Sequence, residues 1–156
     1  KPWLTILEQP IESYTTLFKT CVLQSVNIAK AFLPAMVKKK SGRFIGINTE
    51  GAAETSAGAS AYSSAKRGMN GIFRVLAQEA APYNITVNEV APGWTISDAS
   101  REEKEDDACY IKKIPMGRRG TDTEIANAVA FLASDLASYI TGVYLPVCGG
   151  TIVPGI

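Results

Sequence analysis

A tyrosine and a lysine stand four residues apart within residues 61–68, which read AYSSAKRG. Residues at positions i and i+4 share one face of a helix, so the Lys66 ammonium can lie near the Tyr62 phenol and favour its ionised form. A phenol tuned in this way can give a proton to a carbonyl oxygen or take one from an alcohol. Thr49, in the stretch upstream, adds a hydroxyl group to the same chemistry.

The tyrosine and lysine alone are weak evidence. Six tyrosines and ten lysines scattered over 156 residues give about 0.4 pairs with this spacing by chance. An ordinary pair on an amphipathic helix is therefore the alternative interpretation. The rest of the sequence has to decide between the two.

The composition is that of one soluble globular domain. Of the 156 residues, 46% are hydrophobic and 20% are charged, which is enough to bury a sizeable core. The net charge of +1 offers no basic field for nucleic acid or for an anionic membrane surface. The first residues, KPWL, do not resemble a signal peptide, and no apolar run approaches a membrane span.

The cysteine and histidine counts narrow the chemistry further. Cys21, Cys109 and Cys148 are odd in number and far apart, so neither a disulfide framework nor a metal site is expected, and a cytoplasmic location fits best. The chain has no histidine, which excludes a Ser-His-Asp triad and a Cys-His dyad. Proton chemistry must use Tyr, Lys or carboxylates.

Helices and strands alternate along the chain. Apolar spacing predicts long helices over residues 11–39 and about 60–81, and a shorter one over 123–134 that starts behind Asp122. Short strands are predicted at residues 43–48, 85–90 and 143–147, the last at a sheet edge because it contains Pro146. This order predicts an α/β fold with a parallel, doubly wound sheet.

Two connections could carry a ligand site. The loop from Thr49 to Ser60 is rich in small residues and follows a strand, and open α/β sheets bind ligands at the carboxyl ends of their strands. After Pro92 and Gly93, the acidic and loosely helical residues 94–114 are a candidate lid over a pocket.

Four segments carry a family resemblance: residues 42–49 (GRFIGINT), 61–66 (AYSSAK), 84–93 (NITVNEVAPG) and 124–135 (EIANAVAFLASD). In this order and spacing they resemble the C-terminal half of a short-chain dehydrogenase/reductase. The likeness is strongest to the 3-oxoacyl-[acyl-carrier-protein] reductase and glucose-dehydrogenase-like branch. It implies a Rossmann-type sheet and hydride transfer between NAD or NADP and a small-molecule carbonyl or secondary alcohol.

The resemblance also assigns roles to the reactive residues. Tyr62 would protonate the carbonyl oxygen, and Lys66 would hold the nicotinamide ribose hydroxyls. The family's catalytic serine corresponds to Thr49, whose hydroxyl can still donate to the substrate oxygen. The family's relay asparagine corresponds to Cys21, where a thiol cannot replace an amide and a small buried hydrophobe is the alternative interpretation.

Further cofactor contacts follow from the same resemblance. Pro92 and Gly93 match the turn beside the nicotinamide. Thr95 and Ser97 would face its carboxamide and the phosphates. The resembling proteins pack their two long helices against copies of themselves, so a homodimer or homotetramer is expected.

The family's glycine-rich turn has no counterpart here. No glycine precedes Gly42 and no G-x-G-x-x-G spacing occurs, so the N-terminal dinucleotide-binding half is absent from the sequence. Residues 1–156 are then expected to form the C-terminal part of one Rossmann domain. The alternative to a reductase is a truncated, non-catalytic scaffold or pseudoenzyme, suggested by the changes at Thr49, at Cys21 and at Cys148, where members of the resembling family usually carry Asp or Asn before two glycines. Substrate identity and the choice between NAD and NADP cannot be read from this half.

Overall fold

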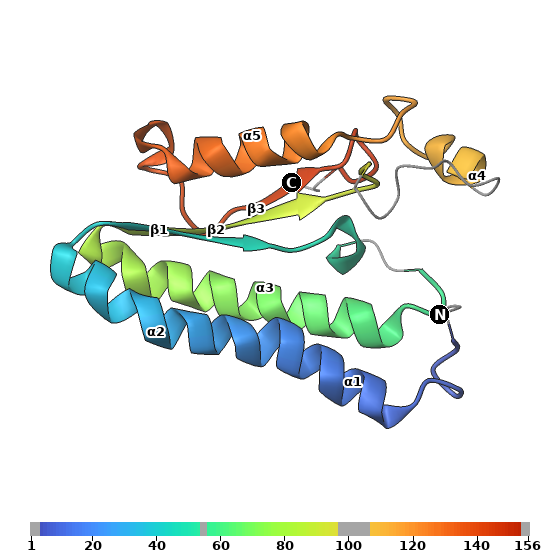
Figure 1. Cartoon of the computed structure of the whole chain (residues 1–156), viewed down its shortest axis with the longest axis horizontal. Coiled ribbons are helices and arrows are strands. Elements are labelled where there is room, and N and C mark those ends of the chain that lie inside the picture. The colour runs from blue at the N-terminus through green and yellow to red at the C-terminus, as the bar shows by residue number, and fades with distance from the viewer. Residues whose placement is uncertain (1–3, 54–55, 97–106, 154–156) are drawn as a thin grey trace.

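The computed structural model describes residues 4–53, 56–96 and 107–153. Two long helical layers and a short sheet make up most of it (Figure 1). In chain order the elements are α1 (Ile11–Phe18), a π-helical segment (Lys19–Leu23), α2 (Gln24–Lys39), β1 (Gly42–Ile47), α3 (Ser60–Ala80), β2 (Ile85–Pro92), α4 (Asp107–Ile111), α5 (Asp122–Ala133) and β3 (Tyr144–Val147). Single helical turns lie at Glu50–Ala52, Ala81–Tyr83 and Asp135–Ala137.

The sheet among these residues has three parallel strands in the order β1-β2-β3. Figure 1 shows α1, α2 and α3 on one face of the sheet and α5 on the other. This arrangement confirms the predicted parallel α/β architecture, of which the chain supplies a part. In the part of the chain that the structure describes, β3 pairs with β2 alone, so Pro146 lies in an edge strand as predicted.

The core lies on both faces of β2, whose residues are buried from Ile85 to Ala91. Toward α3, Phe44 packs against Phe73 with ring centroids 5.5 Å apart. A Cβ added at Gly46 would lie 2.4 Å from Cζ of Phe73, so only glycine lets α3 approach β1 this closely. The opposite face packs against α5 through Leu132.

Two predicted boundaries need correction. The helix predicted over residues 11–39 contains a π-helical segment at Lys19–Leu23, an irregularity that apolar spacing does not reveal. β2 runs on to Pro92, two residues past the predicted end, because the Gly93 amide still donates to the Val147 carbonyl at 3.0 Å. Pro92 is therefore the last residue of the strand and does not interrupt it at an earlier position.

The helical stretch Ile11–Lys39 is long and apolar enough, by length and composition, to cross a membrane, with a mean hydropathy of 1.3. The prediction that no apolar run approaches a membrane span is wrong by this measure. One such helix is weak evidence of a membrane span, because a core helix of a soluble protein has the same length and composition. Only 17% of the apolar window is buried here, including Val22 and Ala29, and the Tyr14 hydroxyl lies 2.6 Å from Ser60 Oγ, so one side of the stretch contacts α3.

Candidate active site

Thr49 and Tyr62 reach the same place from two elements. Thr49 follows β1 at the carboxyl edge of the sheet, and its hydroxyl accepts a hydrogen bond from the Gly51 amide at 3.3 Å. Tyr62 lies in the first turn of α3 and is half-buried. A Cβ added at Gly51 would lie 3.7 Å from Thr49 Oγ1 and 3.9 Å from Tyr62 Cε1. The hydroxyl and the phenol ring therefore flank one small space.

That space opens into a cavity of ≈ 640 Å³. Four of the predicted site residues line it, namely Thr49, Tyr62, Gly93 and Thr95. Trp94 and Tyr110 stack at its rim with ring centroids 4.5 Å apart, and Lys113 Nζ lies 5.3 Å from the Tyr110 centroid. The cavity thus combines hydroxyl groups with an aromatic wall.

Gly93 is fixed by close packing where β2 leaves the sheet. A Cβ there would come within 2.6 Å of Glu50 Oε2 and 2.9 Å of the Cys148 Cα atom. The backbone is therefore exposed to the cavity without a side chain. The Thr95 hydroxyl donates to the Gly93 carbonyl at 3.0 Å, while Pro92 lies in the strand end and does not line the cavity.

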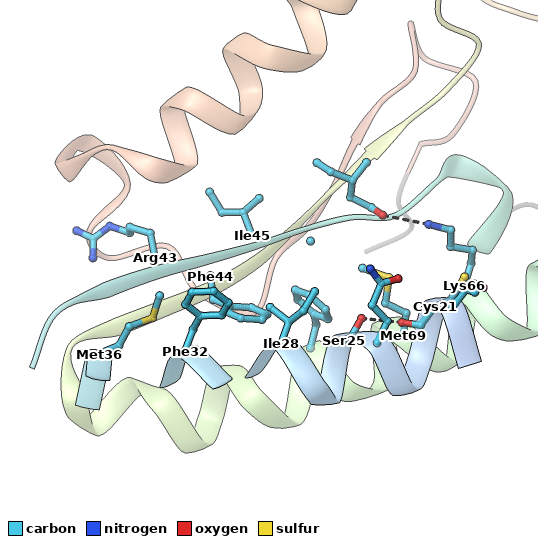
Figure 2. Close-up of a pocket in the computed structure, with 15 residues that line it drawn as sticks. Cys21, Ser25, Ile28, Phe32, Met36, Arg43, Phe44, Ile45, Lys66 and Met69 are labelled. Atoms are coloured by element: carbon cyan, nitrogen blue, oxygen red, sulfur yellow. Dashed lines mark hydrogen bonds between the residues drawn. The ribbon is translucent and has the colours of Figure 1, made fainter. Parts of the chain in front are cut away.

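Lys66 and Cys21 line a different pocket, of ≈ 430 Å³, between the helical layer and β1 (Figure 2). Lys66 Nζ donates to the Ile47 carbonyl at 3.0 Å. Cys21 lies in the π-helical segment, where its carbonyl accepts from Ser25 Oγ at 2.7 Å. The structure thus divides the predicted set between two neighbouring pockets. The predicted contact at Ser97, and much of the predicted lid, lie outside the described residues.

Sequence reading missed a buried polar cluster behind Thr49. The Glu89 side chain is only 1% exposed in β2. Its two carboxyl oxygens accept hydrogen bonds from Asn48 Nδ2 at 2.6 Å and from Asn70 Nδ2 at 2.5 Å. Burial raises the pKa of Glu89, against the opposing effects of both amides and of the Lys66 charge. A carboxylate inside a predicted strand, beside Asn88, was the available signal.

Tyr144 was also missed. Its hydroxyl donates a short hydrogen bond to the Thr49 carbonyl, which reaches from β3 to the residue after β1. Burial, followed by the charge of Glu89, raises the pKa of Tyr144 to about 12. Because its pKa is raised, the Tyr144 phenol stays neutral at ordinary pH and keeps its proton, which it donates to the Thr49 carbonyl.

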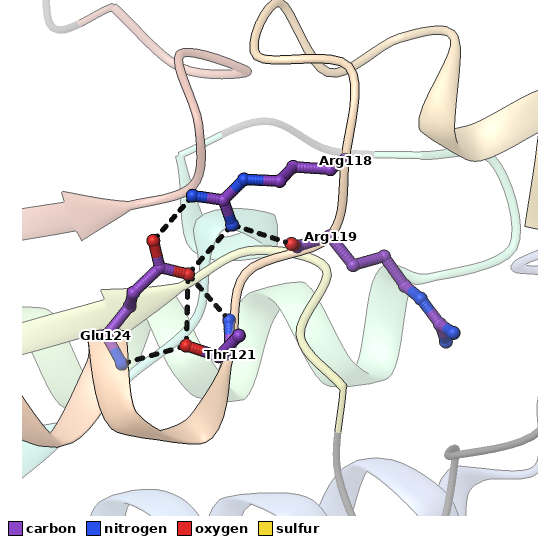
Figure 3. A network of polar contacts seen from close by, with 4 residues as sticks. All are labelled: Arg118, Arg119, Thr121 and Glu124. Carbon is purple, nitrogen blue, oxygen red and sulfur yellow. Dashed lines mark hydrogen bonds and ion pairs between the residues drawn. The ribbon is translucent and has the colours of Figure 1, made fainter.

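An ion-pair network fixes the start of α5 beside the site (Figure 3). Arg118 donates to both Glu124 oxygens, at 2.6 and 2.9 Å, and Glu124 also accepts from the Thr121 amide at 2.8 Å. The Thr121 hydroxyl in turn accepts from the Glu124 amide, so Thr121, not the predicted Asp122, is the N-cap. Next to this cap, Gly120 bridges to Thr95.

Comparison with known proteins gives the family. The profile of the family described as Enoyl-(Acyl carrier protein) reductase matches residues 4–151. The 3-oxoacyl-[acyl-carrier-protein] reductase FabG of Escherichia coli (strain K12) is 42% identical over 140 residues. FabG of Pseudomonas aeruginosa is 44% identical over 124 residues. These matches cover 89% and 79% of this chain.

The similarity covers only part of each relative. The chain spans 57% of the Escherichia coli protein and 50% of the Pseudomonas aeruginosa protein. A solved structure titled "Dehalogenation enzyme" superposes with a TM-score of 0.91 at 30% identity, over 97% of this chain and 65% of that one. Profile, sequence and fold agree, and the chain belongs to the short-chain dehydrogenase/reductase family, in the group described as enoyl-(acyl carrier protein) reductases.

Proposed function

We propose that the protein is an NAD(P)-dependent oxidoreductase that transfers a hydride between a nicotinamide and a carbonyl or secondary alcohol. The carrying observation is the shared space between the Thr49 hydroxyl and the Tyr62 ring, at the carboxyl edge of the sheet. Tyr62 would act as the general acid and base, and Thr49 would donate a hydrogen bond to the reacting oxygen. Both groups would act on one substrate atom.

The residues present fit the nicotinamide end of such a cofactor. Gly93 leaves backbone bare at the cavity, where a side chain would be excluded, so a flat ring can lie against it. We assign Gly93 and Thr95 to the nicotinamide, Pro92 to the turn beside it, and Lys66, with Tyr62, to the ribose hydroxyls. A bound nicotinamide would give a hydride in its reduced form, or accept one from an alcohol in its oxidised form, and the chain would supply or take up the proton and orient the reacting groups.

The first substrates to test are small 3-oxo esters, because the relatives are named as 3-oxoacyl reductases. Trp94 and Tyr110 provide an apolar wall for such a molecule. We further propose that the protein is cytoplasmic.

Replacement of Tyr62 by Phe tests the function. In the full chain, Tyr62→Phe should lower kcat for NADPH oxidation with ethyl acetoacetate by about 10²- to 10⁴-fold, since only the proton donor is lost. Tyr83→Phe, at an exposed phenol in Ala81–Tyr83, is the matched control and should leave kcat unchanged. Equal kcat in wild type and Tyr62→Phe would rule out the tyrosine mechanism.

The second candidate is a non-catalytic scaffold or pseudoenzyme. It is favoured by Cys21, whose thiol replaces the family's amide, and by the separate pockets of Tyr62 and Lys66. The intact mass of the purified protein separates the candidates. A mass well above 16.7 kDa supports the reductase, because it leaves room for a nucleotide-binding half. A mass of 16.7 kDa supports the scaffold.

We also propose that copies of the protein associate through α2 and α3. A groove of ≈ 590 Å³ runs between these helices and is lined mostly by apolar side chains, among them Leu33, Ile72 and Val75. Val75 lines this groove and is 56% exposed, so the groove opens an apolar surface to solvent. A second copy of the same helix pair would cover the groove and give a homodimer or homotetramer.

A further inference from the structure

The Asn48 side chain makes three hydrogen bonds within the cluster, which use both of its donors and its acceptor oxygen. Its Oδ1 accepts from the Thr49 amide at 3.0 Å, so its amide group must face the other way. Nδ2 then donates to the Lys66 carbonyl at 3.2 Å and to Glu89 Oε1 at 2.6 Å. Asn48 is 4% exposed. One buried amide therefore joins the backbones of two proposed active-site residues.

Glu89 supplies the shortest of these bonds. Glu89 lies in β2, and its surroundings come from three places: Asn48, directly after β1, Tyr144 in β3, and Lys66 and Asn70 in α3. Because the Asn48 amide is already oriented by Thr49, it needs an acceptor at the Glu89 position. A buried amide hydrogen without an acceptor would favour rotation of the Asn48 side chain.

Asn70 differs from Asn48 in its other contacts. Among the described residues its side chain bonds to Glu89 Oε2 alone, so its amide can turn over without breaking another bond. A glutamine at position 89 could therefore accept from Asn48 with its oxygen and donate to a reversed Asn70 with its amide. The hydrogen bond from Asn48 and the hydrogen bond from Asn70 can therefore be tested by separate substitutions.

We propose that Glu89 is a positioning residue for the reaction, which acts by holding the Asn48 amide that orients the Thr49 backbone and the Lys66 turn of α3. The proposal rests on the proposed reductase function. Thr49 is held from a second side by Tyr144. Loss of the Glu89 acceptor would leave the Thr49 hydroxyl displaced from the reacting oxygen, and small displacements of this kind cost large factors in rate.

The experiment compares substitutions of the full chain by NADPH oxidation with ethyl acetoacetate. Glu89→Leu should lower kcat about tenfold or more, while KM for NADPH changes less than about threefold. Glu89→Gln should keep kcat within about threefold of wild type, because the acceptor for Asn48 is restored. Asn70→Leu is the control: it should lower the melting temperature but not kcat, since it leaves the Asn48 bonds intact.

Asn48→Ser removes the same bond from the opposite side and should reproduce the kcat loss even if Glu89→Leu does not fold. Unchanged kcat in both variants, or equal losses in Glu89→Gln and Asn70→Leu, would overturn the positioning role. A wild-type chain that neither binds nor oxidises NADPH or NADH would overturn the reductase function and, with it, this role. An active wild type with an equally active Glu89→Leu would overturn the positioning role alone.

Discussion

Glu89 is a carboxylic acid that is buried in the central strand of the described sheet, an uncommon place for an ionisable group. Burial raises its pKa above the ordinary 4.5, while Asn70, Asn48 and the Lys66 charge act in the opposite direction. The folded chain therefore holds this proton more tightly than the unfolded chain does. As the pH rises from the unfolded pKa through the folded one, Glu89 makes folding less favourable.

Glu89→Gln reveals this dependence, because glutamine keeps the shape and does not titrate. The melting temperature of wild type minus that of Glu89→Gln should fall as the pH is raised from about 4.5 to about 8. Thermal unfolding followed by circular dichroism over this range measures the difference. A constant difference would show that Glu89 has the same pKa in both states.

For individual residues, the sequence predicts which side chains share the cavity but not which hydrogen bonds the neighbouring side chains make. The spacing of Tyr62 and the position of Thr49 after a strand were enough to find two groups that share a cavity. The Lys66 bond to the Ile47 carbonyl depends on how α3 packs on β1, which spacing does not encode. The hydrogen bonds of Glu89 could not be predicted either, because its partners Asn48 and Asn70 lie outside β2.

Among the elements, the contact of α3 with β1 depends on one glycine. Gly46→Ala should destabilise the fold by about 1–3 kcal/mol, because the new Cβ would overlap the Phe73 ring. Gly71→Ala is the control: it lies on α3 with no atom within 4 Å of the new Cβ, and it should stabilise by about 0.5–1 kcal/mol. Urea unfolding measures both. If Gly46→Ala and Gly71→Ala change the free energy of unfolding by the same amount, the packing argument for Gly46 is contradicted.

The start of α5 is a second element with a pH dependence. Arg118 and the Thr121 backbone and hydroxyl lower the pKa of Glu124 from 4.5 to about 2. The cap therefore stabilises fully above the unfolded pKa, and this stability is lost as the pH falls toward 2. Glu124→Gln should lower the melting temperature at pH about 7 and lose its effect near pH 2. An effect of equal size at both pH values would contradict the ion pair.

The predicted order of helices and strands was confirmed, because each element carries its own apolar period. The cap was placed one residue late, although the sequence contained the signal: Thr121 is followed three residues later by Glu124, which makes a capping box. The π-helical segment at Lys19–Leu23 had no such signal, since its apolar spacing is that of an ordinary helix.

For the whole molecule, the groove between α2 and α3 gives the testable surface. Val75→Arg should shift the protein to a smaller species in light scattering, because a charge would be buried in the proposed interface. Leu136→Arg is the control, since Leu136 is 83% exposed on the opposite layer beside α5. If both variants keep the wild-type mass in solution, association does not use this groove.

The number of strands in the described sheet could also be predicted, because only three segments of the sequence have the pattern of a strand. What could not be predicted is how the two pockets divide the site residues, because that depends on how α2 and α3 pack against the same face of the sheet. The cavity that Tyr62 lines lies past the carboxyl end of β1, and the pocket that Lys66 lines lies between β1 and the helical layer.

Within the described ranges, β1 pairs with β2 on one side only, and the ≈ 430 Å³ pocket lies along its other side. An extended segment can add there through main-chain hydrogen bonds. By linkage, the free energy of that docking adds to the stability of the whole α3 layer. Under the proposed function, NADPH turnover in a mixture of residues 1–156 with a separately produced nucleotide-binding half would report that the two have docked.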